Sequence, residues 1–275
     1  ATKPRAENGR GRGVREYLDP LTLHKLGSSA KRQTHVDRMP ALSTLADRFG
    51  GPKALDGFRM TSIQHLFPST LGLYDVLDQS GLDRALLGVG GKDYSSNPKT
   101  VTRMQADGYD VHWRAEPRAY AVAQSAEKEA AEMAKDQLAR LFSDVTPEEL
   151  NEVNPPRRFL LLDDGGKLIR ALHQHFPQYA KLAVAIEQTD RGIQLVEDMQ
   201  KTGQELLVPV VNMARSEAKK EAEGPIIGES VAFHADIEIQ SLGPNFKIEP
   251  KVATILGYGA VGRATAHALQ RRGYS

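Results

Sequence analysis

The chain has 275 residues, enough for one large domain or two ordinary ones with a substantial core. Its 36 basic and 35 acidic residues give a net charge of +1, so no overall field would recruit nucleic acid or a membrane surface. Cysteine is absent, which excludes disulfides, thiolate metal sites and a cysteine nucleophile, and no apolar run approaches the roughly 18 residues of a membrane span.

Residues 1–35 combine Gly9-Arg-Gly-Arg-Gly13 with scattered Lys and Arg and little apolar periodicity. This composition predicts a disordered, solvated basic arm. An arginine-glycine segment that contacts RNA is the alternative, but it would need more repeats and interleaved aromatic residues. Because the first residues are not typical of a signal peptide, we expect a cytoplasmic protein.

Strands are predicted to alternate with helices from residue 41 onward. A helix at 41–49 ends at Gly50-Gly51-Pro52, another begins at Ser69 and Thr70, and a long Ala-, Glu- and Lys-rich helix spans 118–142. The strands expected between these helices are 58–65, 84–89 and 109–113. Such alternation favours a parallel sheet covered on both faces, with ligands beyond the carboxyl ends of the strands.

Polar residues directly follow three further predicted strands, at 158–162, 182–186 and 206–211. The first runs into Asp163-Asp164-Gly165-Gly166, which fits either a turn that caps the next helix or a carboxylate aimed into a cleft. The third leads to a helix on which Lys219 and Glu223, four residues apart, can pair or form a solvated charged surface. His173 and His175 fall on opposite faces of their helix, which argues against a metal site there.

The last twenty-five residues carry a nucleotide-binding pattern. An apolar run, Val252 to Leu256, meets Gly257-x-Gly259-x-x-Gly262, which opens an alanine-rich helix. The three glycines would allow the tight turn, the approach of a pyrophosphate and close strand–helix packing. The acid that would hold the ribose, expected about 20 positions on, falls beyond Ser275. We therefore expect this chain, made alone, to bind NAD weakly or not at all, to have no hydrolase activity and to associate.

Several motifs occur in the order and spacing of the S-adenosylhomocysteine hydrolase family, which the chain resembles from about residue 38 onward. The resemblance is carried by Leu161-Leu-Asp-Asp-Gly-Gly166, Glu187-Gln-Thr-Asp-Arg-Gly192, Pro209-Val-Val-Asn212, the helix bearing Lys219, and Gly257-Tyr-Gly-Ala-Val-Gly262. Looser matches lie at Met39-Pro40, Gly57-Phe-Arg59, His65 and Tyr94-Ser-Ser-Asn97.

The resemblance implies an enzyme that uses tightly held NAD to split S-adenosylhomocysteine into adenosine and homocysteine. It implies catalytic roles for Asp163, His65, Lys219 and its partner Glu223, and we expect the first three to face one cleft. Substrate contacts are implied for Glu187, Gln188, Ser69 and Thr70. Cofactor contacts are implied for Thr189, Asp190, Arg191, Gly224, Gly257, Tyr258, Gly259, Ala260, Val261 and Gly262.

The sequence also departs from the family pattern. Gln188 stands where the family has a substrate-binding glutamate, Phe67 replaces a threonine, and Gly224 replaces an asparagine. A pseudoenzyme, a nucleotide-binding regulatory relative, or an NAD-dependent oxidoreductase acting on another small hydroxy compound therefore stays as an alternative. The domains expected are the arm at 1–35, a substrate-type α/β domain at 36–243 and the first βα unit of a Rossmann NAD-binding domain at 244–275. The expected partners are a small-molecule substrate and a second copy of the chain, with neither nucleic acid nor membrane.

Overall fold

A computed structural model describes residues 40–48, 50–93, 95–113, 123–152, 158–243 and 249–275. The predicted basic arm lies outside the described residues. Within these ranges no helix has both the length and the apolar character that crossing a membrane requires.

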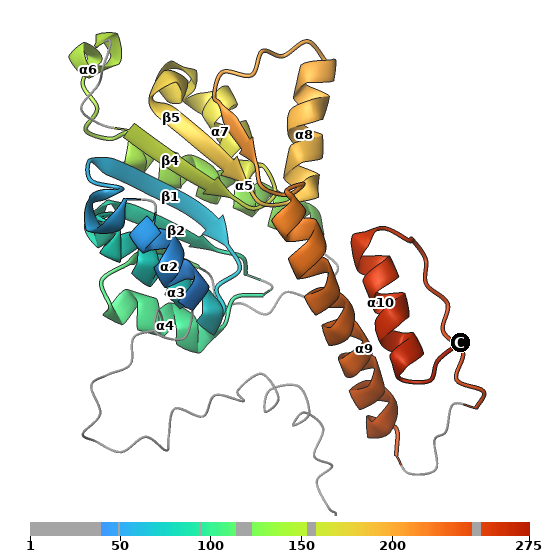
Figure 1. The fold of residues 1–275 in the computed structure, drawn as a ribbon. Coiled ribbons are helices and arrows are strands. Elements are labelled where there is room, and N and C mark those ends of the chain that lie inside the picture. Colours follow the sequence, from blue (N-terminus) through green and yellow to red (C-terminus); the bar gives the residue numbers. More distant parts are fainter. Residues whose placement is uncertain (1–39, 49, 94, 114–122, 153–157, 244–248) are drawn as a thin grey trace, which may run out of the picture.

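The described residues form a six-stranded, entirely parallel sheet in the order β3-β2-β1-β4-β5-β6 (Figure 1). The strands are β1 Phe58–Gln64, β2 Leu87–Gly91, β3 Asp110–His112, β4 Arg158–Asp163, β5 Ala183–Glu187 and β6 Val210–Asn212. The predicted parallel sheet is confirmed. This is the order of a doubly wound sheet, and the winding direction reverses between β1 and β4.

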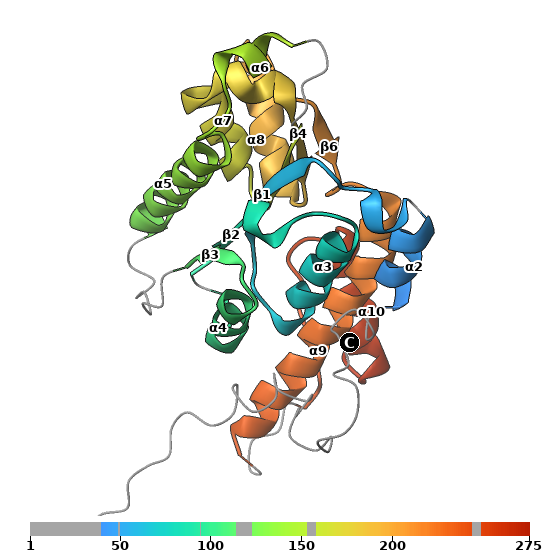
Figure 2. The ribbon, with the colours of Figure 1, turned by 90° about the vertical axis from the view of Figure 1, so that its left-hand side faces the viewer.

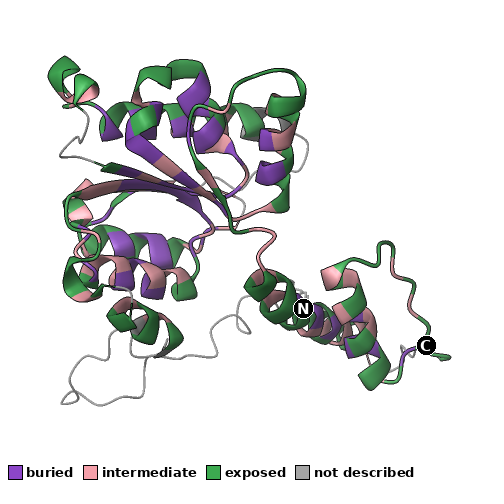
Figure 3. Ribbon diagram, turned by 45° about the horizontal axis from the view of Figure 1, so that its top comes forward, coloured by how far each residue is buried: buried purple, intermediate pink, exposed green. Residues whose placement is uncertain are grey.

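Helices cover both faces of the sheet, and each face has its own apolar core (Figures 1 and 3). One layer consists of α5 Ala123–Leu141, α7 Lys167–His175 and α8 Asp190–Lys201. The other consists of α2 Pro40–Arg48, α3 Pro68–Gln79 and α4 Pro98–Ala106. A short helix, α6 Pro147–Asn151, follows α5 at the rim. Seen from the side, the two layers remain separated by the sheet (Figure 2).

Residue alternation along β4 decides which layer each side chain meets. Phe159 and Leu161 are buried in the core under α5 and α7, whereas Leu160 and Leu162 belong to the core on the other face. Successive strand residues point to opposite faces, so Asp163 continues the first series. Asp164, one residue further, continues the second.

Two strand boundaries differ from the sequence prediction, and two helices were not predicted. Residues 84–86 form a 3-10 turn in which Asp83 Oδ1 accepts from the Ala85 amide at 2.9 Å, so β2 begins only at Leu87. β6 begins at Val210 because Pro209 has no N–H to donate, although its carbonyl accepts from Ala185 at 2.9 Å. Helices α4 and α8 were not predicted from the sequence.

The last two helices extend away from the sheet as a pair (Figure 1). They are α9 Gly224–Ser241, which continues a π-helical turn at Lys219–Glu223, and α10 Ala260–Arg271. They cross closely at Gly228, where a Cβ would lie only 2.5 Å from the Ala264 carbonyl carbon. We expect the terminal unit to dock on the first domain or on another subunit; α10 packs mainly on α9, which lies within residues 36–243.

The strand predicted at Val252–Leu256 does not form. The segment is joined to residue 275 at one end only, where Ala253 N donates to Ser275 O at 3.0 Å. No other described strand lies beside it, so Val252 is 59% and Leu256 95% exposed. A strand needs a partner for its backbone groups, and the described residues offer this segment none.

Candidate functional site

Four polar side chains converge at the carboxyl ends of β1, β2 and β4, where the winding of the sheet reverses. Lys92 Nζ lies 2.5 Å from Asp164 Oδ1, and His65 Nε2 lies 3.5 Å from Asp164 Oδ2. The other ring nitrogen of His65, Nδ1, is 2.5 Å from Ser95 Oγ. Doubly wound sheets bind ligands at this position, so these residues form the centre of the candidate site. The region that they line at the strand ends is the opening.

His65 is tuned by its surroundings. Burial and the nearby Lys92 ammonium, 3.4 Å from Nε2, lower the pKa of His65, and the Asp164 carboxylate opposes them by raising it. A lowered pKa leaves the imidazole neutral at neutral pH and able to accept a proton. The ring of Phe67 lies parallel to the His65 ring with centroids 5.9 Å apart. Phe67 is 44% exposed.

The β5 side of the opening is formed by an amide pair and a lysine. Gln64 Nε2 donates to Gln188 Oε1 at 2.7 Å, which joins the ends of β1 and β5. Lys219 Nζ donates to the Gln188 carbonyl oxygen at 2.6 Å and lies 3.2 Å from Glu223 Oε2. The predicted Lys219–Glu223 pair is confirmed, on a π-helical turn of a kind that is frequent at functional sites.

Asp163 does not join His65 in this opening. It is fully buried, and its two carboxylate oxygens accept from the backbone amides of Lys167 at 3.1 Å and Ile169 at 2.9 Å. The prediction that the Asp163 carboxylate faces the cleft is therefore wrong. The alternation of β4 turns Asp163 towards α7 and places Asp164 beside His65. Lys219 and His65 do lie at the carboxyl edge, as expected.

Glu187 also has its side chain turned towards the helices. Its carboxylate accepts from the amides of Gly165 at 3.1 Å and Gly166 at 2.8 Å, and from both the amide and the hydroxyl of Thr189 at 2.7 Å. It lies beside Asp163 in the β4–β5 register. Burial first, and then the Glu187 carboxylate, raise the pKa of Asp163 to about 7 against the opposing effect of the amide bonds. Asp163 and Glu187 thus hold together the loops that follow β4 and β5. Glu187 does not face the opening, so the implied contact with substrate is not supported.

The other residues implied by the resemblance divide between the loops and the surface. Thr70 Oγ1 donates to the His65 carbonyl at 2.8 Å and so anchors the loop before α3, while Ser69 is exposed on the first turn of that helix. Thr189 caps α8. Asp190 is paired with Arg215 at 2.7 Å, and Arg191 lines a groove between α7 and α8.

The glycine turn has the geometry that its pattern predicts. Gly257 has a φ of +98°, which favours glycine, and a Cβ at Gly262 would overlap the carbonyl oxygen of Gly257. Open space surrounds Gly259, and α10 begins there without a side-chain cap. A Cβ at Gly224 would lie 3.6 Å from Ala260 Cβ, so the turn is in contact with the residue that follows Glu223.

Three residues of the opening were missed as site candidates: Asp164, Lys92 and Gln64. The aspartate pair was recognised, but the wrong member was chosen. Counting two residues along β4 from Leu162, which faces the α3 layer, would have indicated Asp164. Within the described ranges no three His, Asp or Glu side chains come together as metal ligands. His173 accepts from the Leu207 amide at 2.9 Å and lies within 2.8 Å of the Ile169 carbonyl.

Comparison with known proteins adds relatives but no activity. No protein-family model matches the chain. Over 221 residues, 80% of the chain, it is 31% identical to Uncharacterized protein MT0113 of Mycobacterium tuberculosis strain CDC 1551 / Oshkosh. The same values hold for Uncharacterized protein Rv0104 of strain ATCC 25618 / H37Rv. The matched stretch is 40% of each relative, so the chain spans less than half the length of the curated relatives it matches.

Proposed function

We propose that this protein is a diverged relative of the S-adenosylhomocysteine hydrolases, with a strand-end site for an adenosyl thioether and a glycine turn for NAD. The observation that carries the proposal is the convergence of His65, Asp164 and Lys92 at the reversal point of the sheet. Lys219 and Gln188 close the opposite side of the same opening. The resemblance of the motifs supplies the reaction class.

The glycine turn fits a pyrophosphate. A ligand phosphate can approach Gly259 because nothing lies within 4 Å of the position that a Cβ would take. The first amides of α10 have no side-chain cap, and helix N-termini favour anions. In this proposal residues 244–275 are the first βα unit of a Rossmann NAD-binding domain, whose strand at Val252–Leu256 would form only beside a second strand, and 36–243 are a substrate-type domain.

Each polar residue of the opening then has a chemical role. His65, neutral at neutral pH, accepts a proton at Nε2 or returns one to a departing thiolate. Asp164 stabilises the charged imidazolium and Lys92 orients the carboxylate. Lys219, held by the Gln188 carbonyl and Glu223, donates to ribose hydroxyls. NAD, when bound, would supply the oxidation of the ribose that makes the neighbouring C–H acidic.

The absence of cysteine permits a clean test. With S-adenosylhomocysteine and NAD present, homocysteine release can be followed with a thiol reagent, because the protein has no thiol of its own. Calorimetry with S-adenosylhomocysteine measures binding separately from turnover. We expect micromolar binding that His65→Ala weakens at least tenfold. Absence of binding at millimolar concentrations of both this thioether and adenosine would overturn the proposal.

A binding protein without turnover is the second candidate function. It is favoured by the Gln64–Gln188 amide pair, since glutamine cannot act as a base and presents N–H donors where a carboxylate only accepts. Tight binding of adenosine without any thiol release from the thioether would support this candidate over the hydrolase.

A further inference from the structure

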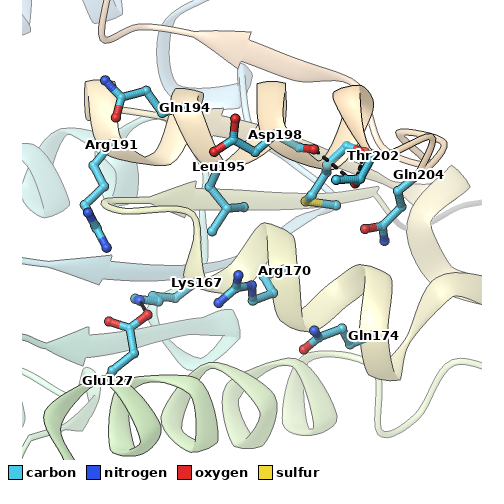
Figure 4. Close-up of a pocket in the computed structure, with 11 residues that line it drawn as sticks. Glu127, Lys167, Arg170, Gln174, Arg191, Gln194, Leu195, Asp198, Thr202 and Gln204 are labelled. Carbon is cyan, nitrogen blue, oxygen red and sulfur yellow. Dashed lines mark hydrogen bonds and ion pairs between the residues drawn. The ribbon is translucent and has the colours of Figure 1, made fainter. Parts of the chain in front are cut away.

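A separate groove lies between α7 and α8, on the helix-covered side of the sheet. It has a volume of about 420 Å³, and its lining includes none of the residues of the strand-end opening. One end is formed by Lys167, Arg170 and Arg191, with Glu127 of α5 opposite (Figure 4). The buried Asp163 carboxylate is turned towards α7, so the groove and the opening belong to different faces of the strand ends.

The charges at this end of the groove are unbalanced. Lys167 is paired with Glu127, but the guanidinium groups of Arg170 and Arg191 make no ion pair or hydrogen bond with any described residue. At this end three cations therefore face one carboxylate, an excess of two positive charges. A second carboxylate, Asp198, lines the groove further along α8 and is itself paired with Lys201 at 3.1 Å. The pKa of Glu127 is lowered, first by the hydrogen bond from Lys167 and further by Arg191 and Arg170, so this carboxylate stays ionised.

The rest of the groove has a mixed surface. Figure 4 shows Arg191 extending from α8 towards α7, with Leu195 one turn further along α8. Leu195 and Met199 supply apolar contact, while Gln194 and Thr202 supply amide and hydroxyl groups. Pockets that combine apolar contact with a few fixed polar groups are typical of small-molecule sites.

We propose that this groove binds a small phosphorylated molecule, with the phosphate between Arg170, Arg191 and Lys167 and the organic body along Leu195 and Met199. Arginine forks match phosphate oxygens and bind them in pairs. A phosphate monoester carries about −1.5 to −2 charges at neutral pH, which matches the excess of two positive charges, whereas a carboxylate neutralises only half of it.

The test is calorimetric titration of the whole chain with phenyl phosphate, inorganic phosphate and benzoate at low ionic strength. We expect phenyl phosphate to bind most tightly, because only it offers both a dianion and an apolar body. Equal affinity for inorganic phosphate would overturn the contact with Leu195 and Met199. Equal affinity for benzoate, or no binding of phenyl phosphate at millimolar concentration, would overturn the phosphate site.

Substitutions in the groove test whether phenyl phosphate binds there. The double variant Arg170→Gln/Arg191→Gln should weaken phenyl phosphate at least about tenfold, since it removes two charge-assisted donors. The control Lys135→Gln/Lys181→Gln removes the same charge from exposed residues outside the groove and should leave the affinity within twofold. Glu127→Gln should tighten binding, because it removes the competing carboxylate and releases Lys167.

Three outcomes would contradict the assignment. Equal weakening in the control double variant would show that only overall charge matters. Unchanged binding in the arginine double variant would place the phosphate elsewhere, for example at the glycine turn. Weaker binding by Glu127→Gln would make the carboxylate a ligand and exclude a phosphate beside it. Unfolding midpoints of all variants should match the parent, because the substituted side chains are exposed.

Discussion

Asp163 and Asp164 are neighbours in the sequence, yet they belong to regions with opposite properties. On the helix side, Asp163 and Glu187 are completely buried and their oxygens are occupied by backbone amides and Thr189. On the opening side, the polar partners of the Asp164 carboxylate among the described residues are the side chains of Lys92 and His65, which are themselves partly exposed. Carboxylates bound to the backbone fix the loops. Carboxylates bound to movable side chains keep bonding capacity for a ligand.

The largest expected effect is a difference in the free energy of unfolding between variants on the helix side and on the opening side. Glu187→Ala would leave four donors without their acceptor, at Gly165, Gly166 and Thr189, and would open a cavity. We expect a loss of about 3–5 kcal/mol in the free energy of unfolding, measured by denaturant titration. Asp164→Ala, the matched truncation on the opening side, should cost less, about 1–2 kcal/mol, because the side chains of Lys92 and His65 can turn to solvent when they lose this partner. Similar losses in both variants would remove the distinction.

The next effect is a pH dependence on the helix side. The pKa of Asp163 is raised from 3.8 to about 7, first by burial and then by Glu187. Between these values the folded chain holds a proton that the unfolded chain has lost, so raising the pH lowers the free energy of unfolding. The stabilisation is complete below about pH 4 and gone above about pH 7, a change on the order of 4 kcal/mol.

Comparison with Asp163→Asn isolates this contribution, because the amide is neutral at every pH. Unfolding free energies at several pH values between 4 and 8 should show the parent losing stability relative to the variant as the pH rises. A parent that instead gains stability relative to the variant would mean that the Lys167 and Ile169 amides keep Asp163 ionised throughout.

Much of this architecture could be predicted from the sequence. The alternation of apolar runs with helical periods gave the parallel sheet, and β1, β4 and β5 begin and end within about one residue of the expected positions. The two faces of β4 could not be assigned in the same way. A strand buried on both sides reads as a continuous apolar run, so its pattern does not say which face each residue meets.

The remaining errors come from contacts between distant segments. Lys92 meets Asp164 across 72 positions of sequence, and Gln64 meets Gln188 across 124. No local pattern contains such a pair. The predicted strand at Val252–Leu256 failed for a related reason: an apolar run becomes a strand only beside another strand, and α9 supplies a helical neighbour instead.

A smaller effect concerns the titration of His65. Lys92→Met should raise the pKa of His65 because it removes a neighbouring positive charge, and Asp164→Asn should lower it because it removes the stabilising carboxylate. Proton NMR of the imidazole resonances, with His65→Asn to assign the signal, measures both shifts. Each variant should lose no more than about 2 kcal/mol in the free energy of unfolding. Shifts of the same sign in the two variants would show that burial alone sets the titration.

The smallest expected effect on stability, and the most direct check of the opening side, comes from Gln188→Glu. Gln64 Nε2 would still donate to a carboxylate oxygen, so the free energy of unfolding should change by no more than about 0.5 kcal/mol. The second carboxylate oxygen would replace the amide donor at the opening and accept from the hydroxyl and amino groups of adenosine. We therefore expect tighter adenosine binding by calorimetry, whereas Gln194→Glu, an exposed substitution on α8, should leave it unchanged. If Gln188→Glu binds adenosine no more tightly than the parent, then Gln188 does not face the ligand, and the opening between β1 and β5 is not the nucleoside site.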